Sequence, residues 1–150
     1  MALKPDRIES HTDISFFMNE VGDRGGVVVH LTGGSGVSMD DANAVVEYSA
    51  TPSGKVPVGV LMNDVVSLDL TRQHINWHKD EALAGSKVCL LRQGQVTTNM
   101  VSGVPTIGQV AYLGVNGIVT PTALPGSVSV GRFISTLDAD GYCKLDINIT

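Results

Sequence analysis

Two histidines, His74 and His78, have the spacing best suited to binding a metal ion. Residues four apart share one face of a helix, so both imidazoles could bind the same zinc ion. However, residues 75–77 lack the glutamate of the metalloprotease motif, and no nearby cysteine offers a further ligand. We therefore predict exposed or loop-packed histidines and no bound metal, with a metal-dependent enzyme that uses this pair as a competing hypothesis.

Two further segments begin like ligand-binding loops but lack the defining residues. The glycine-rich residues 33–36 follow an apolar run, yet Val37 and Ser38 stand where a phosphate loop requires Lys and then Ser or Thr. Residues 138–141, Asp-Ala-Asp-Gly, begin like a calcium loop, but its bidentate glutamate is missing and a strand pattern follows. We predict that both segments are turns, because Gly and Asp are also the residues that tight turns select.

The sequence offers no evident set of side chains for nucleophilic or general acid–base catalysis. None of its serines sits in the glycine-flanked nucleophile elbow of hydrolases. The adjacent carboxylates Asp40 with Asp41 and Asp80 with Glu81 lie in polar segments, where solvated surface positions are expected. We therefore predict that the protein is not an enzyme and uses no cofactor.

The elements that position these residues are predicted to be short strands. The chain of 150 residues has 17 glycines, 43% hydrophobic residues and 17% charged residues, which favours one globular all-β domain over a disordered or helical one. Apolar runs at 27–31, 44–48 and 56–61 alternate with turn residues. Pro57 and Gly59 in the third run predict an edge strand or a bulge.

A hairpin is predicted in the middle of the chain. The runs 87–92 and 95–100 flank Gln93-Gly94, a pair that suits a two-residue turn. The preceding residues 62–84 show a weaker pattern, which we interpret as a strand followed by a polar loop.

The C-terminal residues repeat this pattern. The runs 128–137 and 142–149 flank the turn at 138–141, and a shorter pair is predicted at 110–113 and 117–119. In the last run, alternate residues are apolar and are predicted to face the core: Cys143, Leu145, Ile147 and Ile149.

Charge and cysteine content narrow the range of partners and compartments. The net charge is −5 with no cluster of Lys and Arg, so we expect no nucleic-acid partner. Apolar runs such as 88–91 are far shorter than the roughly 20 residues that span a bilayer, so we expect no membrane partner. Residues 1–7 lack the apolar segment of a secretion signal, which predicts synthesis in a cytoplasm. Cys89 and Cys143 are accordingly predicted to be buried free thiols.

The N-terminal segment differs in composition from the rest. Residues 1–24 mix charges with the apolar Ile14, Phe16 and Phe17 and show no clean strand period, so we interpret them as an arm beside a β-rich domain at 25–150. Adjacent phenylalanines in a terminal segment are typical of an anchor for another surface, which makes these three apolar residues the predicted partner-binding site. An equally open interpretation is a short helix folded back on the domain's own core.

Several segments together resemble the head decoration, or cement, proteins of tailed bacteriophages. The likeness is one of overall texture and runs over nearly the whole chain. It lies in the segments LKPDR (3–7), DISFFMN (13–19), VGVLMNDV (58–65), HKDE (78–81), GSKV (85–88), LLRQG (90–94) and VGRFI (130–134).

This resemblance implies a fold, a location and a partner. The implied fold is a single β-sandwich or barrel-like domain of short antiparallel strands, and the implied location is the exterior of a phage capsid. There such proteins bridge subunits of the major capsid protein lattice and often assemble as homotrimers. The alternative hypothesis is a carbohydrate-binding or host-adhesion β-module of a virion. Such modules usually stack sugars on aromatic rings, and here Trp77 and the tyrosines are few and widely spaced.

Overall fold

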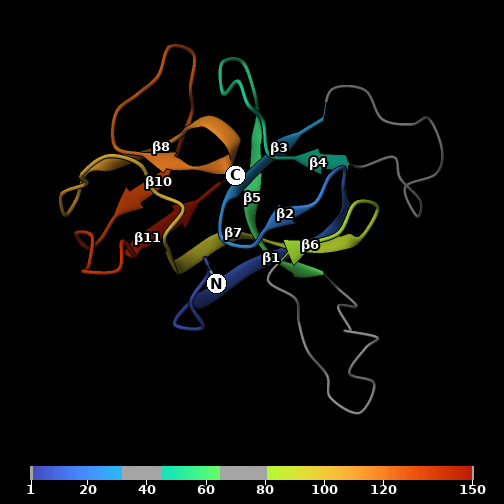
Figure 1. Ribbon diagram of the computed structural model, residues 1–150, viewed down its shortest axis with the longest axis horizontal. Coiled ribbons are helices and arrows are strands. Elements are labelled where there is room, and N and C mark those ends of the chain that lie inside the picture. Colours follow the sequence, from blue (N-terminus) through green and yellow to red (C-terminus); the bar gives the residue numbers. More distant parts are fainter. Residues whose placement is uncertain (1, 32–44, 65–80, 150) are drawn as a thin grey trace.

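The computed structural model describes residues 2–31, 45–64 and 81–149, and within them strands dominate (Figure 1). The elements are β1 (Ile8–Met18), β2 (Gly22–Asp23), β3 (Val27–His30), β4 (Val45–Glu47), β5 (Pro57–Asp64), β6 (Glu81–Ala82), β7 (Lys87–Thr98), β8 (Val110–Leu113), the 3-10 turn η1 (Val115–Gly117), β9 (Val119–Thr120), β10 (Ser129–Phe133) and β11 (Cys143–Asn148). The predictions for residues 33–36 and 40–41 and for His74 and His78 lie outside the described residues.

Nine strands form one mixed sheet in the order β1-β4-β3-β5-β7-β11-β10-β8-β9, and β2 pairs with β6 in a small second sheet. A further antiparallel pairing of β1 with β7 closes part of the large sheet into a ring. The predicted all-β, barrel-like architecture is thus confirmed, with the qualification that β1 runs parallel to β4. In Figure 1, β8, β10 and β11 lie to one side of β3 and β5.

The central strands β3 and β5 are buried on both faces. Val27 to Val29 have no exposed surface, and residues 58 and 60–62 are at most 2% exposed. One face packs in a cluster with β8, β10 and β11, through residues such as Val60 and Phe133, whereas the other packs with Met18, Leu61 and Leu90. A strand covered on both sides needs a continuous apolar run, which explains the sequences VVVH and PVGVLM. The predicted bulge in β5 is present as register shifts, but this strand is central and not at an edge.

The predicted hairpin at Gln93-Gly94 is wrong, because β7 continues through both residues from Lys87 to Thr98. A two-residue turn of type I′ requires positive φ at both positions, and only Gly94 has it, at 148°. Gly94 instead lies between β1 and β11, opposite Glu9 and Ile147. A Cβ at this position would lie 2.0 Å from the carbonyl oxygen of Ile8, so the glycine permits close approach of two backbones.

The predicted C-terminal pair is confirmed as β10 and β11. Cys143, Leu145 and Ile147 are each 1% exposed, and the residues between them face outward. Asp138 shapes the turn, since its Oδ1 accepts hydrogen bonds from the backbone N–H groups of Asp140 (2.9 Å) and Tyr142 (2.8 Å). The shorter predicted pair is confirmed as β8 and β9.

The segment predicted as an arm runs along β7. Leu3 is 2% exposed and forms a bridge with Thr98, and β1 continues the pairing as far as Phe17 opposite Lys87. The helical interpretation of this segment is therefore wrong. Backbone pairing along the open edge of β7 stabilises a strand there even though the segment has no regular alternation, and bulges accommodate the irregular pattern.

Both cysteines are free thiols, as predicted, and Cys143 is buried as predicted, but Cys89 is only half-buried. Within residues 2–31, 45–64 and 81–149, no helix has the length and apolar character that a membrane span requires.

Candidate functional site

A row of side chains crosses five neighbouring strands on the outer face of the sheet. Its members are matched by register: Val110 on β8, Arg132 on β10, Asp146 on β11, Gln95 on β7 and Ile8 on β1. Directly paired residues point to the same face, and Asp146 points outward because its neighbours Leu145 and Ile147 are buried. With strands about 4.8 Å apart, the row is about 19 Å wide.

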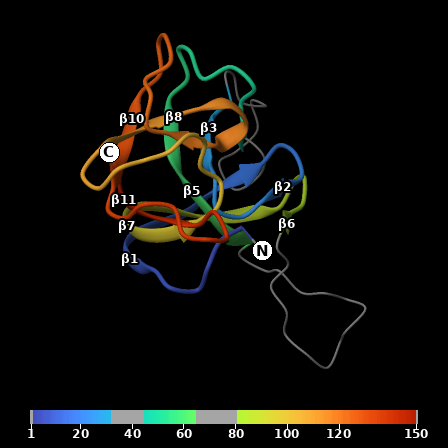
Figure 2. The ribbon, with the colours of Figure 1, turned by 60° about the vertical axis from the view of Figure 1, so that its left-hand side comes forward.

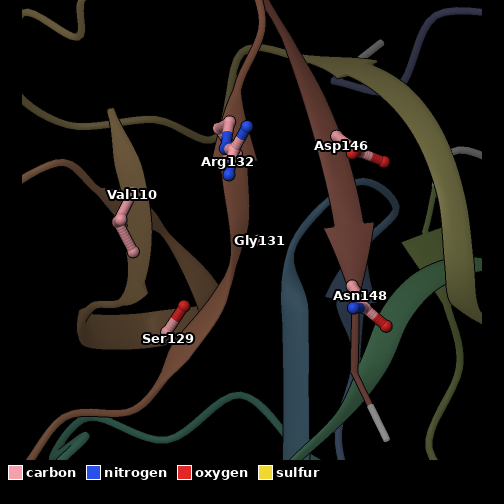
Figure 3. Close-up of a pocket in the computed structure, with 6 residues that line it drawn as sticks. All are labelled: Val110, Ser129, Gly131, Arg132, Asp146 and Asn148. Carbon is pink, nitrogen blue, oxygen red and sulfur yellow. The ribbon is translucent and has the colours of Figure 1, made fainter. Parts of the chain in front are cut away.

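Shallow hollows along this row form one surface, which we call the strand-face groove. One hollow, of about 340 Å³, lies over β8, β10 and β11 and is lined by Val110, Ser129 and Arg132 among others (Figure 3). A second, of about 380 Å³, lies over β11, β7 and β1. Asn148 and Asp146 line both hollows, so they adjoin.

The groove contains two opposite charges that do not pair with each other. Arg132 and Asp146 are direct register partners, yet no ion pair joins them, and in Figure 3 the carboxylate of Asp146 points away from Arg132. Both side chains are exposed. A guanidinium and a carboxylate presented separately can each accept a complementary group from another molecule.

Amide side chains supply the rest of the polar floor. Gln93, Gln95 and Asn148 line the second hollow together with Ser10. Amides and hydroxyls both donate and accept hydrogen bonds, which suits contact with a polypeptide or with sugar hydroxyls. The groove can therefore bind a polar surface without a metal or cofactor.

Beside Ser129 and Asn148 the groove becomes apolar. A hollow of about 220 Å³ is lined by Val56, Pro57, Val128 and Ile149, with Ser129 and Asn148 at the border to the polar floor. Val56 and Val128 are 59% and 42% exposed, whereas Ile149 is 5% exposed. Branched aliphatic side chains thus stand beside amide groups, a mixture typical of protein–protein contacts.

The three predicted partner-binding residues all lie on β1, but their environments differ. Ile14 is 52% exposed and available for contact. Phe16 packs against the cluster that contains Met18 and meets the ring of His30 edge-on, with centroids 5.5 Å apart. Phe17 is half-buried, and the ammonium of Lys87 lies 5.9 Å from its ring centroid. The role of these residues in binding stays a prediction, for which Ile14 is the most accessible.

The backbone beside Ile14 is fixed by Asp13. Its Oδ1 accepts hydrogen bonds from the backbone N–H of Ser15 at 2.8 Å and from the Ser15 hydroxyl, and Arg92 lies 3.7 Å from its other oxygen. Burial raises the pKa of the Asp13 carboxyl, but the Ser15 hydrogen bonds and the Arg92 charge outweigh burial, so the pKa is lowered overall. These contacts accompany the bulge between Asp13 and Phe16.

The groove was not foreseen from the sequence. Alternation in the last strand correctly placed Asp146 and Asn148 toward solvent, but it gave no reason to join them with Ser10 or Arg132. Only the order of strands in the sheet brings these residues together. Within the part of the chain that the structure describes, no three His, Cys, Asp or Glu side chains gather as metal ligands.

No protein-family model matches this chain, and no curated protein sequence matches it.

Proposed function

We propose that this protein is a structural virion protein that binds the outer surface of a tailed-phage capsid and stabilises the lattice of its major capsid protein. The observation that carries the proposal is the strand-face groove, a shallow surface that combines separate charges, amides and aliphatic side chains across five strands. Broad, mixed surfaces of this kind suit contact with another folded protein. The sequence resemblance to decoration proteins supplies the identity of that partner.

The physical effect of such binding follows from mass action. A protein that binds the assembled lattice but not its dissociated subunits stabilises the lattice, by about 2.7 kcal/mol at a free concentration one hundred times its Kd. The pairing of the strands beneath the groove supports this role, because a surface held by paired strands loses little conformational entropy on binding.

The test is co-sedimentation of the purified protein with undecorated capsids of the phage that encodes it. We expect saturable binding at a ratio set by the lattice symmetry. Asp146→Lys should reduce occupancy at sub-saturating concentration by about tenfold, since reversing a groove charge opposes its partner group. Asp140→Lys is the matched control, because it makes the same charge change at an exposed turn residue that does not line the groove. Wild-type protein that stays in the supernatant at every concentration would refute the proposal.

The contribution of β1 is tested in the same assay. Deleting the N-terminal residues would remove Leu3 and Met18 from the core and open the ring, so a point substitution is the cleaner experiment. Ile14→Ser changes an exposed side chain only, and reduced occupancy is expected if Ile14 contacts the capsid. Undiminished occupancy would remove Ile14 from the binding surface.

A second candidate function is that of a carbohydrate-binding module of a virion. The polar floor favours it, because Gln93, Gln95 and Asn148 offer paired donors and acceptors of the kind that bind sugar hydroxyls. A glycan array separates the two candidates. Specific glycan binding that is lost in Asn148→Ala, together with no capsid binding, would favour the carbohydrate-binding module.

A further inference from the structure

The two most exposed large apolar side chains among the described residues lie on one loop. Val104 is 83% exposed and Ile107 is 72% exposed, and both belong to the connection between β7 and β8. We call this pair the knob. Figures 1 and 2 both show the gold loop that contains it extending outward beside β8 and β10.

Hydrogen bonds hold this loop in a defined shape. The side-chain Oε1 of Gln109 accepts from the backbone N–H and the hydroxyl of Thr106, at 3.0 and 3.2 Å. The N–H of Gly108 donates to the carbonyl of Phe133 at 2.8 Å, and the N–H of Phe133 donates to Gln109 at 2.8 Å. Pro105, between the knob residues, is buried. A loop that is already ordered pays little additional entropy when its exposed side chains bind.

The same chain has an apolar hollow of matching character. Val56, Pro57, Val128 and Ile149 line about 220 Å³, which we call the socket. This volume equals that of about seven water molecules in the liquid, enough for a branched aliphatic side chain. Val56 and Val128 thus remain exposed at an opening of suitable size.

Contacts between two loops fix the walls of the socket. The N–H of Gly54 donates to the carbonyl of Gly126 at 3.3 Å, which joins the loop before Val56 to the loop before Val128. A Cβ on Gly126 would lie 2.4 Å from the hydroxyl of Ser53, so glycine allows the two loops to meet. In Figures 1 and 2 these teal and orange loops lie together at the top of the molecule, apart from the gold loop.

Knob and socket cannot meet within one chain. The knob loop is bonded to Phe133 at one end of β10, whereas the socket lies beside Ser129 at the other end. At about 3.4 Å per residue the two ends of β10 are about 14 Å apart. The hydrogen bonds that fix the loop at Phe133 oppose its folding back over that distance.

We propose that the socket binds the knob of a second copy of this chain, in a head-to-tail contact. Both halves are apolar and neither contains a charged side chain, so they complement each other without ion pairs. Because knob and socket are different surfaces, one copy of an associated pair keeps a free socket and the other keeps a free knob. Further copies can therefore add, and the assembly is a ring if the rotation between copies closes and a filament if it does not. The socket is the apolar part of the strand-face groove, so a bound knob covers that part and leaves the charged and amide floor of the groove free for the proposed capsid partner.

The test measures self-association by sedimentation equilibrium of the full chain. We expect the wild type to associate in a concentration-dependent manner and to be insensitive to salt. The knob variant is Val104→Ser with Ile107→Ser, and the socket variant is Val128→Asp. Each should lower the association constant about ten- to one-hundred-fold, the effect of exposing one or two buried aliphatic side chains. Val21→Asp is the matched control, because Val21 is 60% exposed and lies in neither surface.

Mixing the two variants gives the most specific outcome. The intact knob of the socket variant fits the intact socket of the knob variant, so an equimolar mixture should form a 1:1 dimer and stop there. A wild type that is monomeric up to millimolar concentration, variants that associate like the wild type, or a mixture that stays monomeric would each overturn the inference. Thermal melting of every variant shows that the folded state is retained, and Val56→Asp replaces Val128→Asp if the latter unfolds.

Discussion

Replacing Gly94 by alanine should weaken the sheet where β7 meets both β1 and β11. A side chain at the observed φ of 148° is strained by about 1–3 kcal/mol. The new Cβ would also lie 2.0 Å from the carbonyl oxygen of Ile8, which is backbone and cannot rotate away. If the strands separate enough to break two ladder hydrogen bonds, at about 1 kcal/mol each, the total loss is about 3–5 kcal/mol.

The assay is thermal unfolding followed by circular dichroism. At about 2–4 °C per kcal/mol for a chain of this size, Gly94→Ala should lower Tm by roughly 6–20 °C. Gly85→Ala is the control, since Gly85 also has positive φ, at 81°, but a Cβ there would meet nothing within 4 Å. The control should therefore show only the cost of backbone strain. Equal melting temperatures for the two variants would refute the claim that the approach of Ile8 requires a glycine in β7.

Two further predictions concern titratable groups. Burial raises the pKa of the Cys89 and Cys143 thiols, so the fraction present as the reactive thiolate near neutral pH is smaller. We therefore expect both thiols to be alkylated more slowly in the folded than in the denatured protein. Equal alkylation rates in the two states would contradict this prediction. The pKa of Asp13 is lowered, so its carboxylate stabilises the fold above the ordinary aspartate pKa of about 3.9, and this stabilisation is lost as pH falls through the lower folded-state value. Asp13→Asn should accordingly lower Tm near pH 7 and have less effect once the pH lies below the folded-state pKa of Asp13, whereas an equal loss at both would exclude an electrostatic role.

The local pattern of apolar and polar residues correctly predicted strands that have one face buried in the core and the other exposed to solvent. In β11 the alternation of buried Cys143, Leu145 and Ile147 with outward Asp146 reflects one core face and one solvent face, so the residues themselves reveal the strand. The turn at Asp138 was predictable for a similar reason, because its carboxylate bonds to backbone N–H groups only four residues away or fewer.

Long-range pairing explains the predictions that failed. Gln93-Gly94 has the composition of a turn, and only the presence of β1 and β11 on either side makes it part of a strand. Similarly, β1 has little periodicity of its own and depends on the exposed edge of β7. The strand-face groove could not be predicted for the same reason, since its residues come from opposite ends of the chain and are neighbours only in the sheet.

Two glycines link the fold to the groove. Gly94 on β7 and Gly131 on β10 both pair with Ile147, and a Cβ on Gly131 would lie 2.0 Å from the carbonyl oxygen of Asp146. Each glycine also lines one of the two large hollows of the groove. The absence of side chains at these positions therefore lets β7 approach β1 and lets β10 approach β11, and at the same time it leaves the surface concave. Substitutions there should alter stability and surface shape together, so binding defects in such variants must be compared with those of Asp146→Lys, which changes the groove charge alone.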